Sequence, residues 1–409
     1  MLYRITGRAG SGKTEYIRTL LEEKASLGIP CVVIVPTQQS MEYEKEVFTL
    51  LGSKANLNTE VLTFDRLPNR TYREYGGLAV PYADEGGRAL LMAKAAENAK
   101  DRLKAFSSLA EENTFILKML DTSRLLKENG LDVSLLSSFG GESRTSLKAR
   151  ETSVILGEYE SLIKNGNGDS RDLLTLYAES LKTMGFFKGK TVFVDSFNSF
   201  TEQQHRVLDG IASQCDDMYV SLCFDSYDKS GMFSSPGISY ERLARHNKVS
   251  DILLGETHRF SKQSLKYIEA NLWNNSAGTV NDDGGIEFIK CSDRFSEAEA
   301  ASSAIYRLTR SGYRYKDIVV IPRSPDTYSG IIDTVFEKHS IPFFFSSGES
   351  LLIKPLISFI LSCLEAVGNN YPLPAMKRII KSGYLPLSER EADILSRYAD
   401  IWNIRGKAG

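Results

Sequence analysis

The sequence is short of the residues that build cross-linked or metal-bound scaffolds. It has five cysteines and four histidines among 409 residues, with no Cys-x-x-Cys pair and no histidine spacing typical of a metal site. Scattered cysteines in odd number favour reduced, mostly buried thiols of a cytoplasmic protein over a disulfide framework. Zinc is disfavoured as well, because structural zinc needs closely spaced Cys and His pairs.

Long apolar runs and a strong net charge are also missing. No apolar stretch approaches the roughly 20 residues that cross a bilayer, and residues 1–20 carry Arg4, Arg8, Lys13 and Arg18. We therefore expect no transmembrane helix, no secretory signal and no membrane partner. Lysines and arginines number 50 against 52 acidic residues, so the net charge is −2. Any contact with nucleic acid has to come from local basic patches.

The residues that are present describe a globular α/β chain. Hydrophobic residues make up 42% and charged residues 25% of the sequence, and the length suffices for two or three domains. Strand-like runs alternate with helical periods, which predicts a parallel sheet. These runs are residues 2–6, 31–36, 60–64, 190–197 and 217–225. Residues 86–182 are helical in period and contain no convincing strand, so we predict a helical insertion in the sheet.

The last third of the chain repeats the α/β pattern. Residues 274–285 are rich in turn formers and make the best linker candidate. After them we predict strands at 286–291, 317–322 and 342–346, helices at 296–312 and 327–339, and mostly helix beyond Leu351. The chain stops without an evident helix cap, which suggests one part of a longer protein. The predicted domains are residues 1–85 with 186–273, an insertion of residues 86–185, the linker 274–285 and residues 286–409.

Residues 7–14 read GRAGSGKT and fit the pattern G-x-x-x-x-G-K-[ST] in full. The motif follows a strand and opens a helix, which is the context in which it binds phosphate. Its glycines let backbone N–H groups converge on phosphate oxygens, Lys13 adds a positive charge, and the Thr14 hydroxyl can ligate Mg²⁺. The predicted nucleotide-binding residues are Gly7, Arg8, Ala9, Gly10, Ser11, Gly12, Lys13 and Thr14. The alternative is a glycine-rich turn that only packs.

A phosphate loop needs a second strand that ends in an acid. TVFVD (191–195) supplies it, so we predict that Asp195 and Thr14 share the magnesium ion. Many helicase-type ATPases have glutamate next, which activates the attacking water, but here Ser196 follows. Loss of a positioned base removes roughly 100 to 10,000-fold in rate, and Glu202, expected on the next helix, is a poor substitute. We therefore predict binding with little or no hydrolysis and assign no catalytic residue.

Several segments together resemble the AddB family (RexB in some lineages), the B subunits of bacterial ATP-dependent helicase/nucleases. VDSFNSFTEQQHRVL is similar to the D-E-x-Q motif of superfamily 1 helicases, with Ser196 in place of Glu and Asn198 in place of Gln. VVIVPTQQSMEYEKEV, VLTFDRLPNRTYREYGG and the segment 312–344 look like further blocks of the family. THRFSKQSLKYIEANLW (257–273) sits where the helicases carry an Asn-Tyr-Arg motif. The resemblance runs along the whole chain but covers only the N-terminal part of much longer family members.

The resemblance implies a fold, ligands and partners. The fold is a P-loop (RecA-like) parallel sheet, 1A-like, with a 1B-like helical insertion, followed by the start of a second helicase-like α/β domain. The ligands are ATP and Mg²⁺, and the partners are DNA at a double-strand break and an AddA-type subunit. Arg259 is implied to reach the γ-phosphate; the alternative for Arg259 is a surface arginine at the start of a helix. The family's nuclease and its iron-sulfur cluster belong to a C-terminal region that these residues do not include.

Two departures from helicase motifs affect this expectation. Only six residues precede Gly7, so the adenine-reading glutamine of many helicases has no place, and the GDxxQ motif is replaced around residues 222–233. Base specificity and ATP-coupled movement on DNA are therefore in doubt. This departure agrees with a family in which the A subunit is the motor.

A candidate DNA surface lies in residues 61–77, where Arg66, Arg70 and Arg73 alternate with aromatic residues. Such a mixture can hold phosphates and stack bases. The alternative is an amphipathic surface helix with its aromatic side chains in the core. Two other functions also stay open for the chain: a stand-alone P-loop NTPase or kinase acting on a small molecule, and a non-catalytic scaffold.

Overall fold

The computed structural model describes residues 1–55, 58–77, 82–141, 143–164, 168–228, 230–274, 277–345, 351–402, 404 and 406, with backbone only at 53–55 and 353. The described chain divides into two compact units, Met1–Ile286 and Glu287–Gly409. The division falls next to the predicted linker 274–285, whose described residues form neither helix nor strand.

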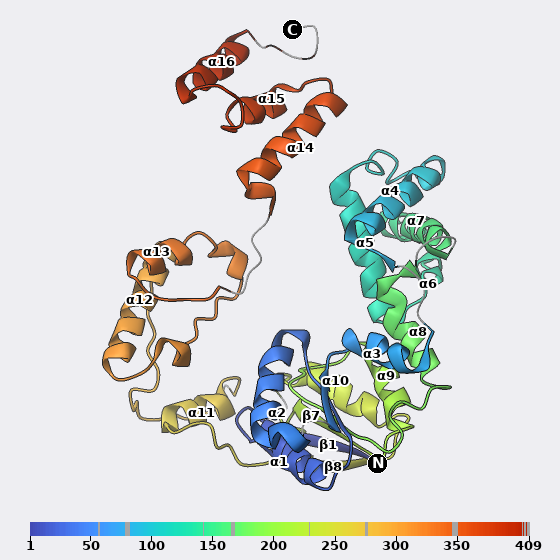
Figure 1. Cartoon of the computed structure of the whole chain (residues 1–409), viewed down its shortest axis with the longest axis vertical. Coiled ribbons are helices and arrows are strands. Elements are labelled where there is room, and N and C mark those ends of the chain that lie inside the picture. The colour runs from blue at the N-terminus through green and yellow to red at the C-terminus, as the bar shows by residue number, and fades with distance from the viewer. Residues whose placement is uncertain are drawn as a thin grey trace. The chain divides into compact units, whose positions relative to one another are not determined.

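The first unit is built on a parallel sheet of six strands within the described residues (Figure 1). The strands are β1 (Leu2–Gly7), β2 (Cys31–Ile34), β3 (Thr59–Leu62), β6 (Thr191–Val194), β7 (Asp217–Cys223) and β8 (Val249–Leu253), in the spatial order β3-β2-β6-β7-β1-β8. Every residue of β2 and β6 is buried, as expected of central parallel strands covered on both faces. The predicted α/β sheet is confirmed, and β8 is a strand that the sequence pattern did not indicate.

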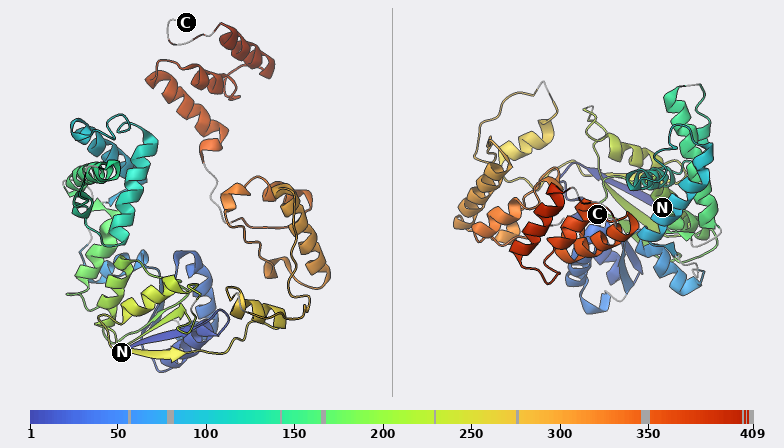
Figure 2. Two further views of the ribbon diagram at one scale, coloured as in Figure 1. Left: turned by 180° about the vertical axis from the view of Figure 1, so that it is seen from behind. Right: turned by 90° about the horizontal axis from the view of Figure 1, so that it is seen from above.

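Helices cover both faces of this sheet. On one face, Ile17 and Leu21 of α1 (Lys13–Ser26) and Val47 of α2 (Ser40–Ala55) pack on Val33 and Phe193. The other face carries α3 (Arg66–Tyr75), α8 (Leu173–Ser180), α9 (Glu202–Ala212) and α10 (Ser234–Leu243). In the view from behind in Figure 2, the yellow-green helices lie over the strands. The unit ends with α11 (Gln263–Asn271).

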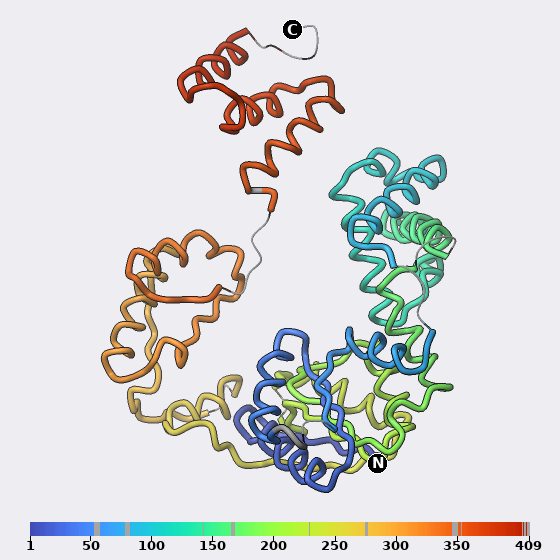
Figure 3. Tube along the Cα trace, in the orientation of Figure 1, coloured from blue at the N-terminus to red at the C-terminus, as the bar shows by residue number. Residues whose placement is uncertain are grey.

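The helical insertion has a core of its own. It consists of α4 (Glu85–Ala99), α5 (Asn113–Glu128), α6 (Ser134–Ser137) and α7 (Arg144–Lys164), whose fully buried side chains include Met92, Ile155 and Tyr159. Figure 3 follows the trace of the insertion, coloured from cyan to green. Two-residue strands β4 (Tyr82–Ala83) and β5 (Gly168–Asp169) pair in parallel. Strand β5 contradicts the prediction that residues 86–182 contain no strand. The sequence did not indicate β5, because two residues are too few to show the alternating pattern of a strand.

The second unit is helical in its described residues. It contains α12 (Arg294–Arg310), α13 (Ile332–Lys338), α14 (Pro355–Gly368), α15 (Leu373–Ile380) and α16 (Glu389–Ile401). The strands predicted at 286–291, 317–322 and 342–346 are wrong, because none of the described residues in these three ranges is in a strand. Residue 346, the last of the third range, lies outside the described residues. The physical reason is that a strand needs a hydrogen-bonded neighbour.

Short 3₁₀ turns complete the described elements, at residues 37–39, 100–102, 170–172, 315–317, 325–327 and 351–353. None of the helices in the described parts of the chain combines the length and the apolar composition that a bilayer span requires.

Candidate nucleotide site

The glycine loop lies at the carboxyl edge of the sheet. Gly7, the last residue of β1, is in register with Cys223 at the end of β7, and Thr6 is in register with Leu253 at the end of β8. Asp195 follows β6, on the other side of β7. The ends of four parallel strands therefore meet here, and open α/β sheets bind ligands at this edge.

The backbone of the loop has the shape that a phosphate cradle requires. Gly10 and Gly12 have φ angles of 80° and 83°, a region that L-residues rarely adopt. Helix α1 begins at Lys13 without a side-chain cap, and its first bond runs from Tyr16 N–H to Gly12 O at 2.9 Å. The N–H groups of Lys13, Thr14 and Glu15 thus have no intrahelical acceptor, and they can bind an anion. In the loop itself, the Ser11 N–H donates to Arg8 O at 3.3 Å.

Position 7 requires glycine for a different reason than the expected turning of the backbone. Its φ is not positive, so it does not serve to turn the loop. A Cβ at this position would lie 2.5 Å from Leu254 O and 2.4 Å from Ser11 Oγ. Glycine is required there because the segment that follows β8 passes directly against the loop.

Lys13 is folded into the loop. Its Nζ donates to the carbonyl oxygens of Gly7 at 2.9 Å and Arg8 at 2.8 Å, with Ser11 Oγ at 3.4 Å. Burial lowers the pKa of Lys13 below its ordinary value, and the Arg259 charge acts in the same direction. The ammonium group is therefore held at the loop but only by neutral acceptors, which a phosphate can replace at a gain in Coulomb energy.

The segment after β8 brings Arg259 to the same place. His258 N–H donates to Gly10 O at 2.8 Å, and a Cβ on Gly10 would lie 2.7 Å from the Cβ of Arg259. The Arg259 side chain is exposed, and its charge acts on Lys13. Arg259 thus belongs to the same unit as the loop, with its Cβ beside Gly10 and its charge close enough to act on Lys13.

The Arg8 side chain turns away from the cradle. It bonds both carboxylate oxygens of Glu269 at 3.0 and 3.2 Å, the Glu269 carbonyl at 2.6 Å and Asp225 at 3.2 Å. Its guanidinium also lies 5.2 Å from the centre of the Phe233 ring. Arg8 therefore ties the loop to α11, and only its backbone is left for a phosphate. Ala9 likewise offers only its backbone, since it has no polar side chain.

Asp195 is buried and already hydrogen-bonded. It is 1% exposed, and its carboxylate accepts bonds from Tyr43 Oη at 3.1 Å and from Ser221 Oγ. Burial, with Asp195 beside it, raises the pKa of Tyr43 well above its usual value, so Tyr43 stays a donor. A carboxylate has about four lone-pair sites, so each oxygen keeps capacity for a hydrated cation. No cluster of three or more His, Cys, Asp or Glu fit to hold a metal occurs in the described residues.

No carboxylate follows Asp195. Ser196 is exposed and has a φ of 67°, an unusual conformation for a residue other than glycine that tends to mark functional sites. Glu202 begins α9, as expected, and its oxygens accept bonds from Arg242 at 3.1 and 3.2 Å and from Arg206 at 3.4 Å. The Arg242 charge, acting against burial, holds the pKa of Glu202 below its ordinary value. Glu202 is therefore an ion-pair residue and an unfavourable proton acceptor.

The three candidate DNA arginines lie on α3 in different settings. Arg66 pairs with Glu44 at 3.1 Å on the surface. Arg70 makes a bidentate pair with Glu60 at 2.6 and 2.7 Å and touches Glu74, which raises its pKa. Arg73 is exposed, and it forms no ion pair with any of the described residues. Only Arg73 keeps its charge available to a phosphate without breaking a pair.

The aromatic residues beside these arginines mostly face inward. Phe64 is 4% exposed and packs on Phe197 and Phe200, and Tyr72 Oη bonds Ser180 Oγ at 2.8 Å. Tyr75 is 46% exposed. The amphipathic-helix alternative thus accounts for two of these three aromatic residues.

The fold and the loop geometry together define a class of protein. The chain has a parallel sheet with a phosphate cradle after β1, an acid after β6 and a helical insertion in the sequence between these two sites. This combination is that of a P-loop protein of helicase type. Residues 4–269 match the family described as "ADDB, N-terminal", and residues 248–404 match the UvrD-like helicase C-terminal domain. Since the first match covers more than half of the chain, the protein belongs to the AddB family, and the resemblance seen in the sequence is confirmed.

Individual relatives agree with this family. The chain is similar to proteins named as the B subunits of ATP-dependent helicase/deoxyribonucleases. It is 29% identical to that of Clostridium novyi (strain NT), over 98% of this chain and 37% of the relative. The identity is 29% to the relative from Thermoanaerobacter sp. (strain X514) and 28% to the relative from Acetivibrio thermocellus. Each match again covers 98% of this chain and 37% of the relative. The chain thus spans less than two-fifths of the length of these relatives.

Proposed function

We propose that this chain is the N-terminal helicase-like region of an AddB-type subunit, part of a complex that processes DNA double-strand breaks. In this proposal it binds ATP and magnesium, hydrolyses ATP slowly or not at all, and contributes to the grip on DNA. The domain division expected from the sequence, with a 1A-like sheet, a 1B-like insertion and a second helicase-like part, belongs to the same proposal. The relatives are named as B subunits of ATP-dependent helicase/deoxyribonucleases, and this supports the AddA-type partner and the DNA substrate.

The observation that carries the proposal is an intact cradle beside a missing base. Positive φ angles at Gly10 and Gly12, the uncapped start of α1, and Lys13 all suit a triphosphate. The acids near the loop already have partners: Asp225 and Glu269 bond Arg8, and Asp195 bonds Tyr43 and Ser221.

The residues of this chain have separate roles in the proposal. Lys13 and Arg259 neutralise phosphate charge, and Thr14 with Asp195 holds the hydrated magnesium ion. The N–H groups of residues 9–14 other than Ser11, whose N–H donates to Arg8 O, donate to phosphate oxygens. Magnesium, when bound, supplies further neutralisation of the phosphates. Ser196 takes no proton from water at neutral pH, because a hydroxyl is a very weak base. In this proposal, nucleotide binding is therefore separated from nucleotide hydrolysis.

The test is a nucleotide titration of the chain and of two variants. We expect Lys13→Ala to weaken binding of ATP with magnesium at least 10-fold, and a binding signal unchanged by this variant would remove the nucleotide claim. Ser196→Glu restores the missing carboxylate, and we expect a gain in hydrolysis over the parent chain. Ser196→Gln is the matched control, because glutamine has nearly the same shape as glutamate but cannot accept a proton from water.

A second candidate function, a stand-alone kinase or NTPase for a small molecule, has less support. It requires a base or an acceptor site near the loop, and the acids there have partners. Rapid turnover of ATP by the unaltered chain in the presence of a small acceptor would favour it.

A further inference from the structure

Three acids are buried within the described residues, and the charge of two of them is compensated. Glu151, Asp169 and Asp195 are 4%, 1% and 1% exposed. Asp169 pairs with Lys127 at 3.0 Å, and Glu151 accepts bonds of 2.8 to 3.0 Å from the backbone N–H groups of residues 104–106. Both arrangements offset the cost of moving an ionised carboxylate out of water.

Asp195 has no compensation of this kind. Its carboxylate accepts bonds from two hydroxyl groups, those of Tyr43 and Ser221. It forms no ion pair with a Lys, Arg or His among the described residues, although it is buried. A hydroxyl donor carries no net charge, and buried charges in proteins are paired or coordinate a metal. Asp195 therefore keeps its negative charge for a cation that comes from outside the chain.

Three elements of the fold fix the position of this carboxylate. Asp195 N–H donates to Ile34 O at 3.0 Å, which extends the ladder between β2 and β6 by one residue. Tyr43 lies on α2, where its ring is buried in the same core as Ile17. Ser221 is buried on β7, between β6 and β1 in the sheet. The two hydroxyls therefore come from rigid elements, and each bonds a different oxygen of Asp195.

The carboxylate lies near the glycine loop. Only β7 separates β6, which leads to Asp195, from β1, which leads to the loop. Ser221 is in register with Ile5, two residues before Gly7. The charge of Asp195 also acts on Lys13. A cation that accompanies phosphates in the cradle can therefore reach this carboxylate.

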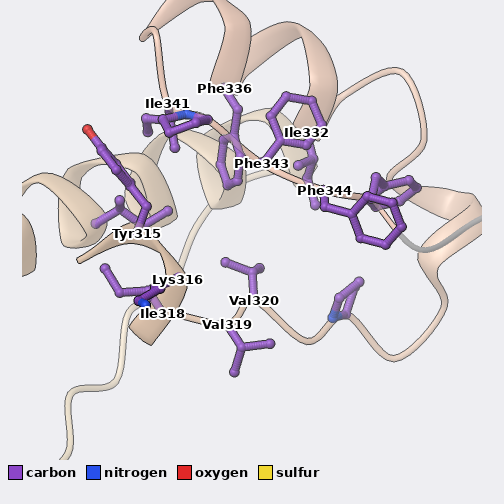
Figure 4. A pocket seen from close by; sticks show the side chains of 14 residues that line it. Tyr315, Lys316, Ile318, Val319, Val320, Ile332, Phe336, Ile341, Phe343 and Phe344 are labelled. Atoms are coloured by element: carbon purple, nitrogen blue, oxygen red, sulfur yellow. The ribbon is translucent and has the colours of Figure 1, made fainter. Parts of the chain in front are cut away.

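The cavity of the second unit offers no similar place for a cation. It measures about 470 Å³, and in Figure 4 apolar side chains such as Val320 and Phe336 surround it. Among the described residues that line it, Lys316 alone has a charged side chain. Magnesium binds to oxygen ligands, carboxylates above all, so an effect of magnesium on this chain is not expected from that cavity.

We propose that Tyr43 and Ser221 are positioning residues for the cation of the nucleotide site. They hold Asp195 in place with one hydroxyl on each oxygen and leave its charge to be neutralised by magnesium that enters with ATP. In the alternative, the two hydroxyls only satisfy a buried acid, and their loss changes stability but not the dependence on magnesium. The inference rests on the proposed nucleotide binding.

Calorimetric titration of ATP, in EDTA and at increasing magnesium concentration, tests this role. In the unaltered chain we expect magnesium to strengthen ATP binding, and we expect Asp195→Asn to abolish this gain. Tyr43→Phe and Ser221→Ala should each raise the magnesium concentration for half-maximal binding by roughly 10-fold or more, with the affinity in EDTA unchanged. Tyr219→Phe is the matched control, because it removes a buried tyrosine hydroxyl on β7 that does not bond Asp195.

The outcomes separate this inference from the proposed function. If Tyr43→Phe and Ser221→Ala respond to magnesium like Tyr219→Phe, while Asp195→Asn loses the response, the positioning role is refuted and the proposed function stands. An equal loss of affinity in EDTA and in magnesium would also refute it, in favour of a structural role. If the unaltered chain binds no ATP, the proposed function fails, and the inference fails with it.

Thermal unfolding without metal or nucleotide gives a second readout. Asp195→Asn removes a charge without a cationic partner, and a hydroxyl can accept a bond from the new amide, so we expect Tm not to fall. Glu151→Gln is the matched change at a compensated acid. It turns an amide toward backbone N–H donors, and Tm should fall by roughly 5 °C or more. An equal fall for Asp195→Asn would show that the chain compensates this charge and would overturn the inference.

Discussion

The contact between Gly10 and Arg259 predicts an unusually large effect for a one-methyl change. Gly10→Ala places a Cβ at a φ of 80° and 2.7 Å from Arg259 Cβ. An L-residue in that conformation costs about 1–2 kcal/mol, and overpacking adds about 1–3 kcal/mol. We expect a loss of about 2–5 kcal/mol in the free energy of unfolding, measured by urea denaturation, and weaker ATP binding by calorimetry because Arg259 is displaced.

Two other glycines separate the strain of the backbone from the contact. Gly12 has a φ of 83° with its nearest neighbour, His258 Cδ2, at 3.7 Å, and Gly189 has a φ of 71° with nothing within 4 Å. Their alanine variants should each lose only about 1–2 kcal/mol. Adding Arg259→Gly to Gly10→Ala should recover about 1–3 kcal/mol, as a double-mutant cycle measures. If Gly10→Ala is no worse than Gly189→Ala, the segment after β8 does not lie against the loop.

Two further predictions follow from buried groups. His205 is 3% exposed with no hydrogen-bond partner on either nitrogen, and burial lowers its pKa to about 4. The unfolded chain therefore binds the proton first, and the free energy of unfolding should fall by on the order of 2 kcal/mol between pH 7 and pH 5. His205→Phe should reduce that slope, and an identical pH profile would contradict the assignment. Arg8→Met should cost about 2–3 kcal/mol by leaving Glu269 and Asp225 unpaired, whereas Arg18→Met on the surface should cost about 0–1 kcal/mol; equal costs in urea denaturation would refute the link between the loop and α11.

The sequence predicted the parts of the site that depend on local pattern. The residues GRAGSGKT specify a loop after a strand, and TVFVD reads as a buried strand that ends in an acid, because both signals lie within eight residues. Five of the six strands of the parallel sheet in the described residues and the helical insertion follow from the same kind of pattern, whereas β8 was not indicated by it.

The remaining features depend on contacts between distant residues. The role of Gly7 rests on Leu254, and the partners of Arg8 lie at Asp225 and Glu269, so no spacing in the sequence indicates them. The strands predicted in the second unit fail for a related reason. DIVVIP has the composition of a buried strand, but pairing needs a neighbour that these residues do not supply.

The most direct test of the central claim measures binding and splitting of ATP in one sample. An excess of the chain is mixed with a trace of labelled ATP and magnesium, and the bound fraction and the released phosphate are followed over minutes. We predict that most of the ATP is bound, that the bound ATP is recovered intact, and that Lys13→Ala abolishes the bound fraction. Release of phosphate on the scale of seconds, abolished by Lys13→Ala, would show that this loop hydrolyses ATP without a carboxylate at position 196 and would contradict the claim.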